Sequence, residues 1–74
     1  MAGPYICIGV GDQVAHRVVL SSYATAHDLE SVDCSNGEYI CIGIGGASQA
    51  AHQQFLTSYA SAHSLPFVEQ ETAC

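Results

Sequence analysis

The sequence has very few basic residues, and this lack excludes several classes of function. Its 74 residues contain one basic side chain, Arg17, against seven Asp and Glu, which gives a formal charge of −6 at pH 7. Electrostatic binding to a nucleic-acid backbone or to an anionic membrane depends on clustered positive charge. We therefore expect no nucleic-acid partner and no membrane partner.

Long apolar segments are also lacking. No apolar run approaches the roughly 18 residues of a transmembrane helix, and the start, Met-Ala-Gly-Pro-Tyr, lacks the pattern of a signal peptide. Large core residues are scarce, with 17 Ile, Leu, Val and Phe in all. Domains this small usually need disulfides, a bound metal or subunit partners to be stable. We expect one soluble domain over residues 1–74, cytoplasmic or virion-associated and not secreted by a recognisable signal peptide.

An internal repeat is the main positive feature. Residues 5–11 read YICIGVG and residues 39–45 read YICIGIG, so six of seven are identical. Residues 15–27 (AHRVVLSSYATAH) recur at 51–63 (AHQQFLTSYASAH) with eight of thirteen identical. Two copies are too few for a solenoid, which needs at least three stacked units. We therefore predict one pseudo-symmetric domain, with repeat one at about 5–35 and repeat two at about 39–72.

Each copy predicts a strand, a glycine-rich turn, a helix and a second strand. Residues 5–10 and 39–44 have the length and β-branched composition of strands. Asp12 and Ser48 are suitable N-cap residues for the helices that follow. Shorter strands are expected at 29–35 and 65–72. The helix faces expected to be buried are Ala15, Val19, Leu20, Tyr23 and Ala26 in one copy, and Ala51, Phe55, Leu56, Tyr59 and Ala62 in the other.

A tight turn is predicted at Asn36-Gly37, because a type I′ hairpin needs positive φ at both positions. The expected order is therefore β-α-β, hairpin, β-α-β. This order predicts an α+β, ferredoxin-like βαββαβ fold, with an antiparallel sheet, the first and third strands at its centre and both helices on one face. The alternative treats residues 29–35 as a loop and pairs the two Ile-Cys-Ile strands in parallel.

The hairpin also sets a register, which places Cys34 opposite Tyr39 and Val32 opposite Cys41. Because side chains alternate along a strand, the Ile residues face the helices. The other face presents Tyr5, Cys7, Val32, Cys34, Tyr39 and Cys41. Nothing else in the chain is expected to cover this apolar face, and such faces mark interfaces. We therefore predict a homo-oligomer that assembles sheet against sheet. The layout resembles ferredoxin-like proteins that dimerise through their sheets, a fold analogy that carries no functional residues.

Four histidines and two tyrosines are the weak catalytic candidates. His16 and His27 lie eleven positions apart with Tyr23 between them, and His52, Tyr59 and His63 repeat this arrangement. Eleven residues are about three helical turns, so each set lies along one stripe, where His and Tyr could act as acid, base or ligand. The simpler interpretation is that last-turn histidines interact favourably with the helix dipole and that duplication explains the rest. No carboxylate lies at a catalytic spacing, which favours the simpler interpretation.

The four cysteines contain no C-x-x-C pair, so a zinc or redox motif has no support in the sequence. Cys7, Cys34 and Cys41 are expected on one sheet face, and Cys74 is the last residue. We expect the protein to fold with buried, reduced thiols and without a metal or cofactor. A disulfide between Cys7 and Cys41 stays open, since it needs Cα atoms within about 7 Å.

The turn that enters the second helix is a candidate anion-binding site. Backbone amides at a helix N-terminus can hold an anion, and Gly43, Gly45, Gly46 and Ser48 carry no acidic side chain, unlike the first turn with Asp12. Neither turn matches G-x-G-x-x-G or a P-loop. The favoured interpretation is that the glycines allow tight strand-to-helix turns. Glu69 and Glu71 are expected in a solvated tail.

The leading functional hypothesis is a small acidic, homo-oligomeric module without enzymatic activity that acts through its assembly surface. It would be a structural, accessory or ligand-sequestering protein, and a short acidic chain of this kind suits a viral or phage origin. One alternative is a small dimeric α/β-barrel-type enzyme that uses Tyr and His in a pocket between helices and sheet. Another is anion or nucleotide binding at the turn over 43–48.

Overall fold

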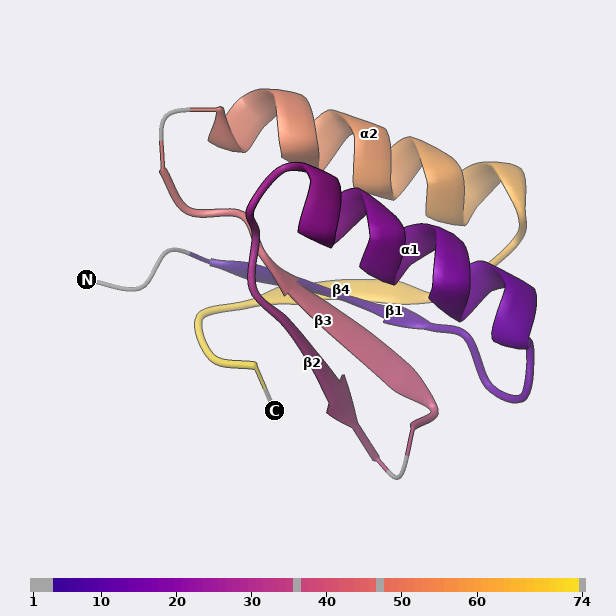
Figure 1. The fold of residues 1–74 in the computed structure, drawn as a ribbon. Helices are drawn as coiled ribbons and strands as arrows, with labels where there is room; N and C mark the ends of the chain where they lie inside the picture. The colour runs from indigo at the N-terminus through magenta and orange to yellow at the C-terminus, as the bar shows by residue number, and fades with distance from the viewer. Residues whose placement is uncertain (1–3, 36, 47, 74) are drawn as a thin grey trace.

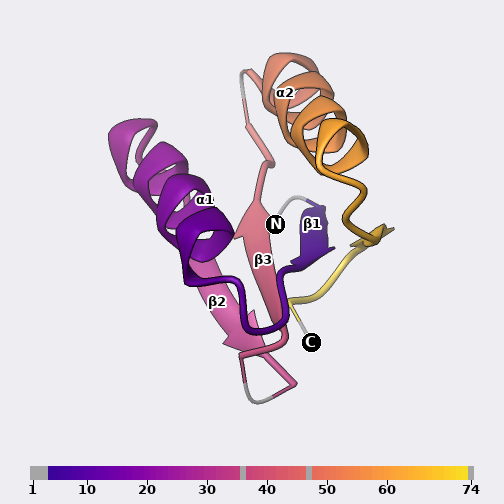
Figure 2. The same ribbon diagram turned by 90° about the vertical axis from the view of Figure 1, so that its right-hand side faces the viewer.

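The computed structural model describes residues 4–35, 37–46 and 48–73, which form a helix layer on a sheet (Figure 1). In chain order the elements are β1 (Tyr5–Gly9), α1 (Val14–Ala26), β2 (Ser31–Cys34), β3 (Tyr39–Gly43), α2 (Gln49–Ala62) and β4 (Phe67–Gln70). The strands form one antiparallel sheet in the order β2-β3-β1-β4. Both helices lie on the same face of it (Figure 2). The predicted α+β class and the central position of β1 and β3 are confirmed.

The two central strands are antiparallel, and Cys7 lies directly opposite Cys41 at the middle of the pair. The alternative with parallel Ile-Cys-Ile strands is therefore wrong. Its premise fails because residues 31–34, which it treats as loop, form β2 and pair with β3.

The β2–β3 hairpin has the predicted register, with Val32 opposite Cys41 and Cys34 opposite Tyr39. The amide of Glu38 donates to the carbonyl oxygen of Ser35 across the turn at 3.2 Å, and Gly37 has a φ of +91°. The type I′ assignment depends also on Asn36, which lies outside the described residues.

The side chain of Arg17 on α1 connects this hairpin to the helix layer through hydrogen bonds. Its guanidinium donates to the carbonyl oxygen of Gly37 in the hairpin and, at 3.3 Å, to that of Gly11 before α1. The single basic side chain of the protein therefore links two backbone segments of the fold.

The hydrophobic core lies between the sheet and the helices. The Ile side chains of β1 and β3 face the helices, as predicted from their alternation with Cys. The buried residues are Ile6, Ile8, Val10, Ile40, Ile42 and Ile44 from the central strands and their ends, Leu20 and Ala24 from α1, Leu56 and Ala60 from α2, and Leu65.

The predicted buried faces of the helices are only partly right. Ala24 and Ala60, which those faces omit, are fully buried because a small side chain lets the helix approach the sheet closely. Phe55 is 41% exposed and stacks on Tyr23 of the other helix, with ring centroids 4.3 Å apart. Five further residues of the predicted faces are exposed, namely Ala15, Val19, Ala26, Ala51 and Ala62.

The N-cap of α1 is Gln13, so the N-cap role predicted for Asp12 is wrong. The chain first runs beside the hairpin, where the amides of Val10 and Gly11 both donate to the carbonyl oxygen of Glu38, at 2.8 and 3.0 Å. This anchoring delays the start of the helix.

Both helices end in a Schellman motif, which shortens the strands that follow. In α1, His27 is the C-cap, Asp28 has a φ of +59°, and the amide of Leu29 donates to the carbonyl oxygen of Ala24 at 2.7 Å. Leu65 makes the equivalent bond in α2, at 2.8 Å. These leucines therefore complete helix ends instead of opening strands.

Candidate functional site

One surface of the sheet, opposite the helices, gathers the six residues predicted to share it. Val68 and Gln70 of β4 join them, because they pair with Cys7 and Tyr5 of β1. We call the following eight residues the sheet face: Tyr5, Cys7, Val32, Cys34, Tyr39, Cys41, Val68 and Gln70.

The end of the chain covers part of the sheet face, so the expectation that nothing covers it is wrong. The segment after β4 turns back beneath the sheet, and Ala73 packs against the cysteine cluster (Figure 1). Cys7 and Cys41 are only 2% and 1% exposed, whereas Val68 is 47% exposed. A few residues suffice as a cover because the cysteine side chains beneath them are small.

Cys7 and Cys41 form a disulfide across the central strands, which overturns the expectation of reduced thiols. Their Cα atoms are 3.9 Å apart, because the antiparallel register places the two residues directly opposite each other. Cys34, which is itself disulfide-bonded, has its Sγ atom 3.1 Å from that of Cys41. The sheet face therefore has a covalently fixed, sulfur-rich centre.

Each tyrosine of the sheet face lies over a glycine of the neighbouring central strand. A Cβ atom at Gly43 would lie 3.1 Å from Cε2 of Tyr5, and one at Gly9 would lie 3.2 Å from Cε2 of Tyr39. These two glycines therefore allow aromatic rings to pack against the backbone. For Gly43, which lies within β3, this finding corrects its interpretation as a residue that serves a tight turn.

The hydroxyl of Tyr5 donates a hydrogen bond to Oε1 of Glu30 at 2.5 Å. This bond raises the pKa of Tyr5, and burial and the negative charge of Glu30 act in the same direction. The phenol therefore stays protonated and holds the residue before β2 at the edge of the sheet face.

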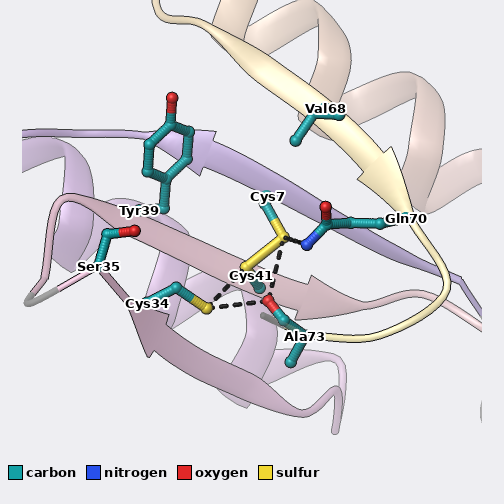
Figure 3. Close-up of a pocket in the computed structure, with 8 residues that line it drawn as sticks. All are labelled: Cys7, Cys34, Ser35, Tyr39, Cys41, Val68, Gln70 and Ala73. Atoms are coloured by element: carbon teal, nitrogen blue, oxygen red, sulfur yellow. Dashed lines mark hydrogen bonds between the residues drawn. A yellow bond between two sulfur atoms is a disulfide. The ribbon is translucent and has the colours of Figure 1, made fainter.

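A hollow of about 340 Å³ opens on the sheet face (Figure 3). Tyr39 and Val68 stand on either side of the Cys7–Cys41 disulfide (Figure 3). The lining residues are Cys7, Cys34, Ser35, Tyr39, Cys41, Val68, Gln70 and Ala73. None of their side chains carries a charge. This hollow is the candidate site. The sequence predicted that four of its residues share one face of the sheet, but it did not predict a hollow there.

The candidate His and Tyr residues contact each other between α1 and α2. The sequence had predicted that they would lie together along a single helix. His16 Nδ1 of α1 shares a hydrogen bond of 2.8 Å with the hydroxyl of Tyr59 of α2. The ring of His63 lies 4.7 Å from that of His16 and 4.4 Å from that of Tyr59. We call these three residues the His16 cluster.

The His52 cluster, His52 with Tyr23 and His27, has the same geometry with the helices exchanged. The hydroxyl of Tyr23 shares a hydrogen bond of 2.8 Å with His52 Nδ1, and the rings of His27 and His52 are 4.9 Å apart. Burial raises the pKa of Tyr23. The structure therefore does not bring His16 and His27 together, although they share a helix.

Both clusters consist of hydrogen-bonded imidazole and phenol groups that connect the two helices. Each contains two imidazoles and one phenol, without a carboxylate. Within residues 4–35, 37–46 and 48–73, no group of three or more His, Cys, Asp or Glu is arranged to hold a metal ion. The arrangement joins α1 to α2 at two points.

Replacing Tyr23 or Tyr59 by Phe is expected to lower the free energy of unfolding by about 1 kcal/mol each, because one hydrogen bond is lost while the ring remains. The two losses should add approximately in the double variant, since the two hydrogen bonds share no group and the rings that stay in place keep their contacts with Phe55. Urea denaturation measures them. Tyr39→Phe is the matched control, because no described residue shares a hydrogen bond with its hydroxyl. Equal stability of all three variants would contradict the linking role.

The turn between β3 and α2 offers fewer free amides than the anion-site hypothesis assumes. The amide of Gly43 already donates to the carbonyl oxygen of Glu30 at 2.8 Å. Ser48 is the N-cap of α2, as predicted, and its side chain makes no capping hydrogen bond. The hypothesis therefore depends on Gly45, Gly46 and Ser48.

Sequence reasoning missed three contributors to the site. The repeat aligns Val68 with Val32, which is a signal for its position, whereas Gln70 follows from the pairing of β4 with β1 and Ala73 lies in a segment without a periodic pattern. Glu69, expected in a solvated tail, lies in β4 and accepts a hydrogen bond from Gln53 Nε2 at 2.7 Å.

Comparison with protein-family models, with curated proteins and with solved structures found no match to this chain. None of the helices that the structure describes combines the length and apolar character needed to cross a membrane.

Proposed function

We propose that the protein is a small, non-enzymatic, homo-oligomeric module that assembles through its sheet face. The observation that carries the proposal is the set of apolar side chains left accessible around the hollow. Val32 and Tyr39 are half-buried, and Val68 is 47% exposed. Accessible apolar side chains of this kind favour association, because a partner removes them from water.

The charge distribution supports a second copy as the partner. None of the eight residues of the sheet face is charged, while the net charge is −6. Two such molecules repel each other through charged surfaces but can meet through a neutral one. Glu30 touches the edge of this face, where its carboxylate accepts the hydrogen bond from Tyr5.

We propose further that the fold is ferredoxin-like and derives from two repeats. The strand order β2-β3-β1-β4 supports this assignment. So do contacts that match at an offset of 36 residues, since His16–Tyr59 and Tyr23–His52 have the same hydrogen-bond length.

The enzyme alternative has less support from the geometry. It requires Tyr and His in a pocket between helices and sheet, whereas the two clusters lie between the helices. The disulfide also favours a different compartment from the expected cytoplasm, because disulfides persist in oxidising environments. We therefore propose that the module matures in such a compartment.

Val32→Asp is expected to abolish self-association, because it would bury an unpaired charge in the interface. Light scattering at micromolar concentration should show an oligomer for the parent protein and a mass of 7.7 kDa for the variant. Ser31→Asp is the matched control, since Ser31 neighbours Val32 on β2 but points to the opposite face. It should keep the parent mass.

A further variant identifies the interface if it lies elsewhere. The helix layer also exposes apolar side chains, including Val18, which is 54% exposed. Loss of the oligomer in Val18→Asp, together with its retention in Val32→Asp, would move the interface to the helices. A parent protein of 7.7 kDa at micromolar concentration would refute assembly altogether.

A further inference from the structure

We infer that the hollow on the sheet face binds a small, uncharged, planar molecule that carries one hydrogen-bond donor. Its volume of about 340 Å³ lies within the range of small-molecule sites, roughly 300–1,000 Å³. The site shares a surface with the proposed oligomer, but its lining belongs to one molecule, so the inference does not depend on assembly.

The floor of the hollow is rigid and polarizable. The Cys7–Cys41 disulfide joins the two central strands beneath it, and Sγ of Cys34 lies beside that bond (Figure 3). A covalently fixed floor loses little freedom when a ligand binds. Sulfur makes favourable contacts with aromatic rings, and the ring of Tyr39 provides an apolar wall. These features select a flat, aromatic body.

The lining also excludes ionised ligands. None of the eight lining side chains is charged, so an anion or a cation would lose its hydration without gaining a counter-charge. The polar groups available to a ligand are neutral, and they include the hydroxyl of Ser35 and the amide of Gln70.

The carbonyl oxygen of Ala73 specifies the hydrogen-bond donor. It lies 2.9 Å from Sγ of Cys34 and 3.4 Å from Sγ of Cys7 (Figure 3). Both sulfur atoms are in disulfides and carry no proton. Among the described residues, no N–H or O–H group donates to this oxygen. A ligand N–H or O–H would supply the missing donor.

The side chain of Gln70 also holds the covering segment in position. Its Nε2 donates to the carbonyl oxygen of Thr72 at 3.2 Å and to Sγ of Cys7 at 3.5 Å. These bonds tie the covering segment to the floor, so the carbonyl of Ala73 is held in place before a ligand arrives.

Indole is a suitable probe, because it is flat, neutral and carries one N–H. The protein contains no Trp, so the fluorescence of indole can be followed selectively. Titration should give saturable binding. The donor-free analogue 1-methylindole should bind about fivefold more weakly, as expected for one lost hydrogen bond. Indole-3-acetate should show no saturable binding. Equal binding of the three molecules, or none by indole, would overturn the inference.

Val68→Phe tests the location, because the larger side chain obstructs the hollow beside the disulfide without adding charge. It should abolish saturable binding of indole. Val14→Phe is the matched control on the helix layer, where Val14 is 66% exposed, and it should bind as the parent does. Unchanged binding in Val68→Phe would overturn the assignment.

The monomeric state separates this inference from the proposed function. Val32 does not line the hollow, so Val32→Asp should keep saturable binding of indole even where it no longer associates. Binding that disappears in Val32→Asp but persists in Ser31→Asp would overturn the assignment to one molecule and place the site between copies.

Discussion

Removing the Cys7–Cys41 disulfide is expected to lower the free energy of unfolding by about 3–4 kcal/mol. The bond joins residues 34 positions apart, and its loss frees a long loop in the unfolded chain. A domain of this size has a total stability of roughly 4–11 kcal/mol. The loss should therefore reduce the melting temperature by about 12–30 °C.

Thermal melts followed by circular dichroism test this result in the double variant Cys7→Ala/Cys41→Ala. The variant is preferable to chemical reduction alone, because a reductant also breaks the disulfide bond of Cys34. The reduced parent should be no more stable than the variant. A melting temperature within a few degrees of the parent would show that the bond adds no stability.

Truncating the central leucine of either helix is the second large effect that we expect. Leu20 and Leu56 are both 0% exposed and lie in the core between helices and sheet. Leu20→Ala or Leu56→Ala should lower the free energy of unfolding by about 2–5 kcal/mol, because each leaves a cavity in a closely packed interior.

Val18→Ala is the control for these truncations, since Val18 is 54% exposed on α1 and its loss should cost at most about 0.5 kcal/mol. Urea denaturation with the disulfide intact compares the variants. Equal losses in Leu20→Ala and Val18→Ala would mean that α1 is not packed on the sheet as described.

The two central strands and the β2–β3 hairpin were predictable because local signals determine them. Alternation of Ile and Cys in YICIG assigns each side chain to a face, and Asn36-Gly37 sets the hairpin register without reference to distant residues. The hairpin sets no register between β1 and β3, so the position of Cys7 directly opposite Cys41 is a finding of the structure. Whether these cysteines are bonded did not follow, since spacing in the sequence carries no Cβ geometry.

The helix layer was less predictable, because its contacts depend on how two helices lie together. The hydrophobic arc of α2 predicts that Phe55 lies in the core. Its ring instead stacks on the ring of Tyr23 of the other helix. The hydrogen bond between His16 and Tyr59 joins residues 43 positions apart, and neither residue type indicates its partner. Ala73 was missed for the same reason, since only the tertiary fold brings it beneath the sheet.

The position of the disulfide has a consequence for the integrity of the molecule. Cys7 belongs to the first half of the chain and Cys41 to the second, so the bond ties together segments that the β2–β3 hairpin also connects. A proteolytic nick between Gly37 and Glu38 would cut the polypeptide without separating its halves. The nicked protein would remain one covalent species until reduction, and a two-chain form could carry out whatever the intact chain does.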